Sequence, residues 1–225
     1  WRDLWRQPAA SLFYGIAIMV AGVVILGVTA SLPYLFAAAV TGFLLVAPML
    51  AAGLYELSRR YLAGEPAALT DSMLAWRRNP SALVGFGLLS ILAGTVWQVA
   101  SVVIVALFYQ GPALAPQAMI IEVLVNPRHY LMFFIYMCSG GLLAAVVFAL
   151  SVVSMPMLVD RRGDLLAALS TSLNAVAENP LPLAFWAALL MLLTGIGFAT
   201  ALLGLIVIMP WLGHASFHAY KELVE

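Results

Sequence analysis

The chain has 225 residues, of which 64% are hydrophobic and only 9% are charged, and its mean hydropathy is +1.05. Soluble domains carry about 25% charged residues, and a water-soluble protein of this size could not bury so much apolar surface. Ten basic and ten acidic residues give zero net charge, which indicates neither a nucleic-acid partner nor a polybasic lipid tether. Composition therefore predicts an integral membrane protein whose main partner is the lipid bilayer.

The single cysteine, Cys138, lies in an apolar run and excludes an intramolecular disulfide framework. Because the sequence does not begin with methionine, we expect it to start inside a longer gene product, and a signal peptide cannot be judged. No stretch has the composition of a linker. We therefore expect residues 1–225 to form a single transmembrane helical domain.

Long apolar runs predict transmembrane helices, since a helix needs about 20 apolar residues to cross the hydrocarbon core. The first four runs cover about residues 9–30, 33–55, 81–109 and 129–159. As one helix, the last stretch, 180–220, would be roughly 60 Å long, about twice the core thickness. A break near residues 194–197 would divide it into two spans, about 182–195 and 198–218. We expect this hairpin, and hence an all-α bundle of six transmembrane helices, with a single last span as the alternative.

The distribution of basic residues predicts the orientation, because lysine and arginine concentrate in cytoplasmic loops. With six spans, one side carries Arg2, Arg6, Arg59, Arg60, Arg77, Arg78, Arg161, Arg162 and Lys221. The other side carries only Arg128, and with five spans Lys221 would join it. Both termini are therefore expected in the cytoplasm, although this rule separates six spans from five only weakly.

Proline positions suggest a three-fold repeat of helix hairpins. Three helices would open at Pro8, Pro80 and Pro180, and three second spans would close with a proline triplet at residues 48–50, 156–158 and 210–212. Asn79 and Asn179 would cap their helices. The later prolines would kink theirs and free a backbone carbonyl that a neighbouring group must satisfy. The alternative is that prolines are common at membrane boundaries without any repeat.

Two cytoplasmic segments, residues 66–78 and 164–178, are amphipathic. The second carries an apolar stripe made of Leu165, Leu166, Leu169, Leu173 and Val176. Such helices lie at the headgroup level or pack beneath a bundle, and the alternative is a docking site for a soluble partner.

Four polar residues are candidates for binding. His214 and His218 stand four residues apart on one helical face, a spacing that can chelate a metal, and the alternative is two interfacial histidines that bond to neighbouring groups. Gln98 lies within the third span, where an amide needs a hydrogen-bond partner on another helix or on a substrate. Glu56 ends the second span, and local ion pairs with the arginines that follow it would explain it without a function.

Catalytic motifs and mid-span charges are missing from the sequence, so we expect no enzyme activity and no cofactor. Small residues such as Gly140 and Ala144 would let helices approach closely, either within the bundle or in self-association. These features favour a non-catalytic scaffold or accessory subunit of a membrane complex, in contact with other membrane proteins or further copies of itself. The alternative is a small-molecule or lipid transporter, which a central repeat and Gln98 would suit.

Three segments carry a family resemblance: WRxPxxSLxYG at residues 5–15, GLYELSRR at 53–60 and PWLGHASxHAY at 210–220. They look like a bacterial family catalogued only as predicted integral membrane proteins of unknown function. The resemblance covers essentially the whole chain and implies a multi-pass protein of the cell inner membrane. Some similar sequences are labelled cytochrome c oxidase subunit I, but that enzyme resembles a much larger bundle with several buried histidine ligands, and this chain has only three histidines.

Overall fold

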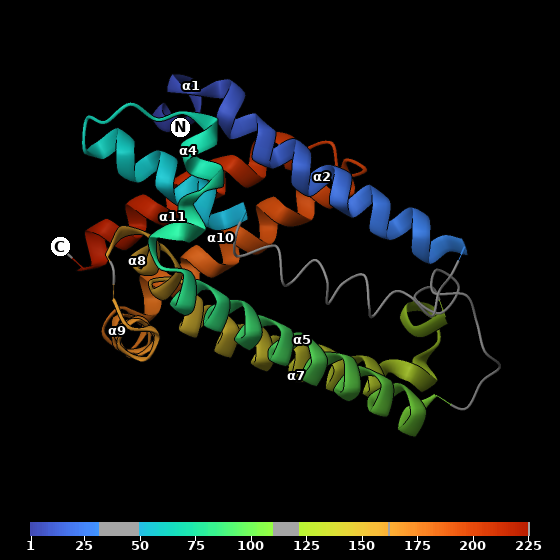
Figure 1. The fold of residues 1–225 in the computed structure, drawn as a ribbon. Helices are drawn as coiled ribbons and strands as arrows, with labels where there is room; N and C mark the ends of the chain where they lie inside the picture. The colour runs from blue at the N-terminus through green and yellow to red at the C-terminus, as the bar shows by residue number, and fades with distance from the viewer. Residues whose placement is uncertain (32–49, 110–121, 162, 225) are drawn as a thin grey trace. The chain divides into compact units, whose positions relative to one another are not determined.

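The computed structural model describes residues 1–31, 50–109, 122–161 and 163–224, and within these ranges the chain is helical and has no strand. It divides into two compact units, which we describe separately (Figure 1). The first unit comprises Trp1–Ile91 and Phe148–Glu225, and the second comprises Leu92–Val147. Helices α5 (Pro80–Phe108) and α7 (Tyr130–Ser151) each contribute to both units. The predicted all-α class is thereby confirmed for the described residues.

Four helical segments are long and apolar enough to cross a membrane: Pro8–Val28, Pro80–Phe108, Pro127–Asp160 and Pro180–Ala199. They correspond to the predicted first, third, fourth and fifth spans. Most of the predicted second span, residues 33–55, lies outside the described residues. The part that is described forms a helix over residues 50–62, past the predicted end of that span. The count of six spans is therefore not confirmed.

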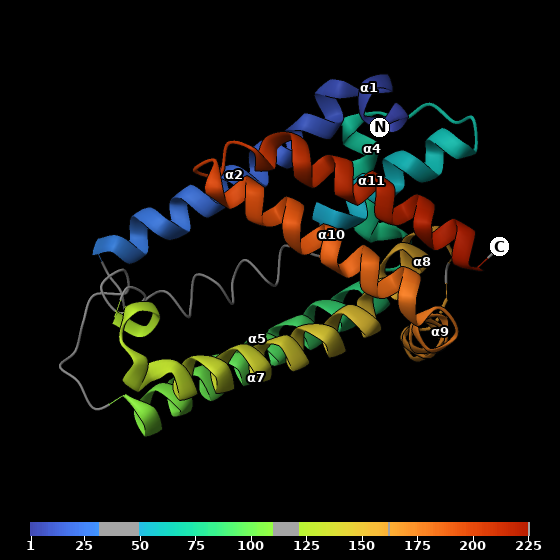
Figure 2. The same cartoon turned by 180° about the vertical axis from the view of Figure 1, so that it is seen from behind.

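The last apolar stretch forms two helices, α10 (Pro180–Ala199) and α11 (Leu205–Val224), which lie side by side in the first unit (Figures 1 and 2). The predicted break at residues 194–197 was wrong, because these residues stay helical and the turn covers 200–204. The Thr200 hydroxyl explains this position: it donates to the Gly197 carbonyl and accepts from the Gly204 amide, both at 2.9 Å. Although the stretch is divided as expected, α11 is not among the four segments that qualify as spans.

A proline kink divides the fourth span into α7 and α8 (Ser154–Asp160). Pro156 has no N–H to bond the carbonyl four residues before it, and the helix is interrupted at that point, residues 152–153. The Ser172 hydroxyl enters the break, where it donates to the Ala149 carbonyl at 2.7 Å and accepts from the Val153 amide at 3.2 Å. The predicted kink is thus present, and a serine of another helix bonds two of the backbone groups at the break, the Ala149 carbonyl and the Val153 amide.

That serine lies on α9 (Leu165–Glu178), whose predicted apolar stripe is only partly buried. The buried face consists of Ala168, Ser172 and Ala175, small residues that let α9 approach α8 closely. By contrast, Leu166 and Leu173 are 73% and 46% exposed. The helix therefore presents one small-residue face to the protein and a separate leucine face to its surroundings.

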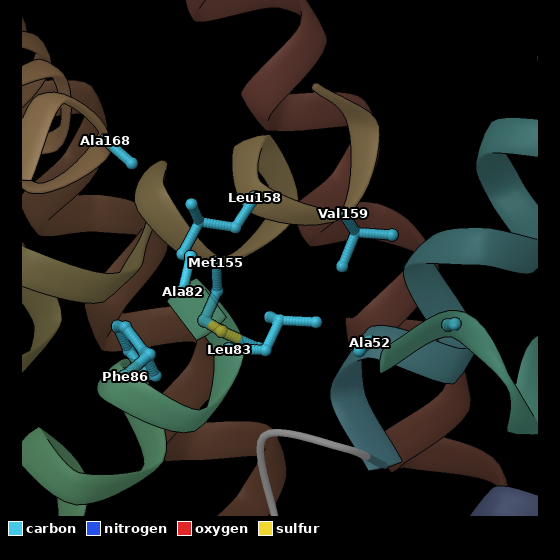
Figure 3. Packing of buried hydrophobic residues seen from close by; sticks show 9 residues of the cluster. Ala52, Ala82, Leu83, Phe86, Met155, Leu158, Val159 and Ala168 are labelled. Atoms are coloured by element: carbon cyan, nitrogen blue, oxygen red, sulfur yellow. The ribbon is translucent and has the colours of Figure 1, made fainter. Parts of the chain in front are cut away.

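The largest apolar core of the first unit joins five helical segments of the chain (Figure 3). Its buried members are Ala52, Ala75, Ala82, Leu83, Phe86, Met155, Leu158, Val159 and Ala168. Of those in Figure 3, Ala52 comes from helix 50–62, Leu83 from α5 and Leu158 from α8. Burial of one such leucine in place of water contact stabilises a fold by about 1.5–3 kcal/mol. This core packs helix 50–62, one of the helices that contribute to the polar site, against η2, α5, α8 and α9.

The predicted asparagine caps are wrong, although α5 and α10 do begin at the predicted prolines. Asn79 donates to the Gly163 carbonyl at 2.9 Å, and Asn179 donates back to the Ala175 carbonyl at 3.2 Å. Both side chains therefore act as donors to other backbone segments instead of accepting from their own helix. The amphipathic segment before Asn79 is broken into α4 (Leu69–Met73) and the 3-10 helix η2 (Ala75–Arg78). The three-fold repeat stays a prediction, because much of its first hairpin lies outside the described residues.

In the second unit, α5 and α7 lie side by side (Figures 1 and 2). The rings of Trp97 and Tyr136 meet edge to face, with centroids 4.8 Å apart. Gly140 provides the space for Trp97, since a Cβ there would lie 2.8 Å from the indole, whereas a Cβ on Gly141 would meet nothing within 4 Å. Of these two adjacent small residues, one serves packing within the chain and the other does not.

Candidate functional site

The three segments that carry the family resemblance meet in the first unit and form a buried polar cluster. Ser11 belongs to α2 (Pro8–Ser31), Ser58 to helix 50–62 and His214 to α11. Asp3 joins them from α1 (Arg2–Arg6), the short helix that precedes α2. All four side chains are buried, and His214 is only 1% exposed. We call these four residues the Asp3–His214 cluster.

His214 is held between two serine hydroxyls, with Nε2 at 2.9 Å from Ser11 Oγ and Nδ1 at 2.7 Å from Ser58 Oγ. Ser58 donates its own proton to Asp3 Oδ2 at 2.6 Å. Because that proton is used, His214 Nδ1 donates to Ser58. In the neutral ring Nε2 is then the acceptor for the Ser11 hydroxyl, so both nitrogens of a neutral imidazole have partners.

Asp3 receives a second hydrogen bond, from His218 Nε2 at 2.8 Å from Oδ2. Burial opposes the charged carboxylate, but the hydrogen bonds from His218 and Ser58 outweigh that effect, and the pKa of Asp3 lies below its ordinary value. The carboxylate therefore stays ionised and ties α1 to both helix 50–62 and α11. His218 itself is partly exposed, so it links the buried carboxylate to the surface.

Close backbone approach brings α2 and α11 together beside this cluster. Pro210 lies inside α11 and cannot donate to the carbonyl of Ile206, four residues before it. Gly15 of α2 lies directly against that carbonyl, so that a Cβ at position 15 would clash with the Ile206 backbone. Because Gly15 has no side chain, its Cα–H group can face the Ile206 carbonyl. That carbonyl lacks the N–H donor that a residue other than proline would supply at position 210.

A second glycine supports the same arrangement. Gly53 lies against the phenol ring of Tyr14, where a Cβ would clash with the hydroxyl end of the ring. Tyr14 reaches past it and bonds Ser72 Oγ at 2.9 Å, and Ser72 donates to the Leu69 carbonyl at 2.8 Å. The glycine therefore lets Tyr14 connect α2 to α4.

Glu56, predicted as a binding residue, is buried, and its carboxylate forms ion pairs with arginines of the same chain. It accepts from Arg59 Nε at 2.8 Å and from Arg60 Nε at 2.8 Å, and Arg78 Nε lies 3.6 Å from it. Burial raises the pKa of the Glu56 carboxyl, but the bonds from Arg59 and Arg60 outweigh this and lower it below its usual value. Arg78 also donates to the Val159 carbonyl, so Glu56 joins helix 50–62 to α8 through this arginine.

A polar pocket of about 280 Å³ opens beside the Asp3–His214 cluster. Its polar lining comes from Asp3, Arg6, Gln7, Tyr61, Glu65 and His214. The Arg6 guanidinium lies over the Tyr61 ring, 4.1 Å from its centroid. The pocket thus combines a cation, two carboxylates and an aromatic ring.

Gln98 lies in the second unit, half-buried on α5, and the Ser101 hydroxyl donates to its backbone carbonyl at 2.9 Å. The side-chain amide makes no hydrogen bond among the described residues. A shallow pocket of about 320 Å³ lies farther along the helix, lined by Ser101, Val102, Val105, Ala106 and Tyr136, and does not include Gln98. The structure therefore does not bring Gln98 together with the other three predicted site residues.

The two predicted metal ligands, His214 and His218, do lie close to one another, but around a carboxylate: His214 Nδ1 is 3.9 Å and His218 Nε2 is 2.8 Å from Asp3 Oδ2. Over the described ranges, no group of three metal-ligating side chains is formed. Metal binding at these histidines stays a prediction.

Sequence reasoning missed Asp3, Ser11 and Ser58 as site residues. Two of them lie in the segments that carry the family resemblance, which was the signal that could have found them. Asp3 had no such signal, because its partner Ser58 is 55 residues away in the chain and nothing in the local pattern joins them.

Comparison with known proteins identifies one family. The family model described as "Predicted integral membrane protein (DUF2189)" matches residues 35–160, more than half of the chain. No curated protein and no solved structure matches the chain.

Proposed function

We propose that this chain, which belongs to the DUF2189 family of predicted integral membrane proteins, is a non-catalytic scaffold or accessory subunit of a membrane complex. We further propose that it lies in the cell inner membrane with both termini in the cytoplasm. Support for the orientation comes from the one-sided arginines and from the first unit, in which the two termini lie at the same end (Figure 1).

The observation that carries this proposal is the side-chain amide of Gln98, which has no hydrogen-bond partner among the described residues. It lies within a helix of 29 residues that contains no charged residue and is long and apolar enough to cross a membrane. In a membrane, lipid would be the solvent around most of this helix. An amide without a partner in such a solvent costs free energy, so a hydrogen-bonding group from another protein chain would stabilise it. An accessory subunit that contacts a partner through α5 meets this need.

The composition of the remaining membrane helices agrees with a protein that binds other proteins and does not move ions or protons. Helices α2, α7 and α10 also contain no charged residue. Ion-coupled carriers and proton pumps use ionisable groups within their spans. In the first unit the buried side chains of Asp3, Ser58 and His214 are bonded to one another, whereas the indole nitrogen of Trp186 is buried without a partner among the described residues.

Purification in mild detergent tests the proposal with matched variants of α5. Gln98→Leu removes the amide, and Thr95→Val removes an exposed polar group one turn away on the same helix. We expect wild type and Thr95→Val to retain the same stoichiometric partner, or the same oligomer, and Gln98→Leu to lose it. A wild-type protein that is consistently a solitary monomer contradicts the proposal.

A transporter for a small molecule or lipid is the second candidate, and the shallow pocket between Ser101 and Tyr136 favours it. Its walls are mainly apolar, which suits an apolar solute or an acyl chain. Solute uptake into proteoliposomes that falls with Gln98→Leu would support this candidate, whereas an accessory subunit gives no uptake in either form.

A further inference from the structure

The polar pocket beside the Asp3–His214 cluster contains groups of both charges that are not saturated within the chain. Arg6 stacks on Tyr61 but forms no ion pair with any described residue. Asp3 and Glu65 each use only one carboxylate oxygen, Oδ2 for Ser58 and His218 and Oε2 for Arg59. Over the described part of the chain, Asp3 Oδ1 and Glu65 Oε1 have no hydrogen-bond partner.

Because the pocket contains both a cation and carboxylates, it favours a ligand that carries both charges. A simple anion that approached Arg6 would also meet the two carboxylates, and a simple cation that approached the carboxylates would also meet Arg6. A ligand with a phosphate and an ammonium group satisfies both, because guanidinium binds phosphate with paired donors and a carboxylate accepts from a primary ammonium. The volume of about 280 Å³ is at the small end for ligand pockets, which suits a headgroup and not a whole lipid.

The position of the pocket agrees with this chemistry. Trp1 and Trp5 flank Asp3 on α1 and are 57% and 62% exposed. Trp1 packs edge to face on Trp211 of α11, with centroids 5.7 Å apart. Exposed tryptophans collect at the headgroup level of membranes, where the phosphate and amine groups of lipids lie, and Arg6 is on the same short helix as Trp5.

We propose that this pocket binds a phosphoethanolamine group, with its phosphate on Arg6 and its ammonium on Glu65 and Asp3. Tyr61 holds the Arg6 guanidinium in place through the ring contact, and Gln7 adds a neutral amide to the rim. The inference goes beyond the scaffold role and does not depend on it, because Gln98 lines no part of this pocket.

Native mass spectrometry of the full-length chain tests the proposal with two lipids that share their acyl chains, dioleoyl phosphatidylethanolamine and dioleoyl phosphatidylglycerol. We expect preferential retention of the ethanolamine lipid by the wild-type protein. Loss of one charge-assisted contact in Arg6→Gln or Glu65→Gln should weaken that retention by roughly tenfold or more. Arg2→Gln is the matched control, since Arg2 is exposed on the same helix and does not line the pocket.

Free phosphoethanolamine distinguishes the two sources of the group. Displacement of the lipid by millimolar free compound supports a site for the headgroup, and binding of the free compound to delipidated protein without any lipid preference supports a soluble ligand at the same site. Equal retention of both lipids, with no effect of Arg6→Gln and no binding of the free compound, overturns the proposal. Melting temperatures of Arg6→Gln and Glu65→Gln close to wild type ensure that a loss of binding is not a loss of fold.

Discussion

Ser58 has a bridging position in which one hydroxyl serves a buried carboxylate and a buried imidazole. Its Oγ lies 2.6 Å from Asp3 Oδ2 and 2.7 Å from His214 Nδ1. Both groups are almost fully buried, with 6% of Asp3 and 1% of His214 exposed, so removal of the hydroxyl takes a hydrogen-bond partner from each of them. The residue therefore matters more to stability than its small size indicates.

Ser58→Ala should lower the free energy of unfolding by about 1–3 kcal/mol, because two buried polar groups lose a partner. Thermal unfolding in detergent micelles measures the effect. Ser170→Ala is the control, since Ser170 is exposed on α9 and bonds only the Ala167 carbonyl of its own helix. Equal melting temperatures for the two variants would contradict the bridging role.

The lowered pKa of Asp3 predicts how stability depends on pH. Its carboxylate is more acidic in the folded protein than its ordinary value of 3.8, so the folded state binds fewer protons than the unfolded state in that range. The contribution is fully present above pH 3.8 and is lost as the pH falls through the lowered folded pKa.

The difference in melting temperature between wild type and Asp3→Asn should therefore be constant near neutral pH and shrink below about pH 4. Glu178→Gln, a change at an exposed carboxylate, should give no such trend. If the difference in melting temperature between wild type and Asp3→Asn grew in acid, the pKa of Asp3 would be raised and not lowered in the folded protein.

At the scale of elements, the contact between α2 and α11 depends on a glycine and a proline that face each other. Gly15→Ala places a methyl group into the Ile206 backbone, so the helices must separate and the Asp3–His214 cluster must open. Gly27→Ala is the matched control in the same helix, because a Cβ there meets nothing within 4 Å. We expect a loss of about 1–3 kcal/mol for Gly15→Ala, and none or a slight gain for Gly27→Ala, in thermal unfolding.

Equal stabilities of Gly15→Ala and Gly27→Ala would mean that α2 does not approach α11 as closely as described. In that case the hydrogen bond between Ser11 and His214, which depends on the same approach, would also be in doubt.

Elements of this fold were predictable from the sequence to different degrees. The helices that begin at Pro8, Pro80 and Pro180 follow from proline positions and long apolar runs. The turn at residues 200–204 was not predictable, because Ala201 and Leu202 adopt positive φ angles of 53° and 70° that neither residue favours by itself. The Thr200 hydroxyl and the space at Gly197 stabilise that turn, and both act through contacts made after the helices fold back.

The candidate site was less predictable than the helices. His214 and His218 were identified from their spacing, but their common partner Asp3 is 215 residues away from His218 in the chain. The local hydrophobic pattern gives no information on a pair so far apart in the chain. The two serines that bond His214 lie in helices, where the sequence pattern does not distinguish them from other small residues. Gln98 could be identified from the sequence alone, because an amide inside an apolar run is unusual. That signal does not depend on where in the chain its hydrogen-bond partner lies.

At the scale of the whole molecule, the chain combines charge-free membrane helices with polar contacts gathered at the end of the first unit that holds both termini. The buried polar cluster fixes α1, α2 and α11 to one another. In the second unit, by contrast, α5 and α7 meet through aromatic and glycine packing, and the Gln98 amide on α5 has no partner in the part of the chain that the structure describes. The polar cluster of the first unit stabilises the chain. The Gln98 amide of the second unit is the group that we propose contacts another protein.

Photocrosslinking from position 98 tests this account most directly. A benzoylphenylalanine replaces Gln98 in one variant and Thr95 in another, and cells are irradiated before the membranes are dissolved. We predict one dominant protein adduct from position 98, either a specific partner or a second copy of this chain, and much less from position 95. Adducts to lipid alone from both positions would contradict the proposal that α5 meets another protein within the membrane.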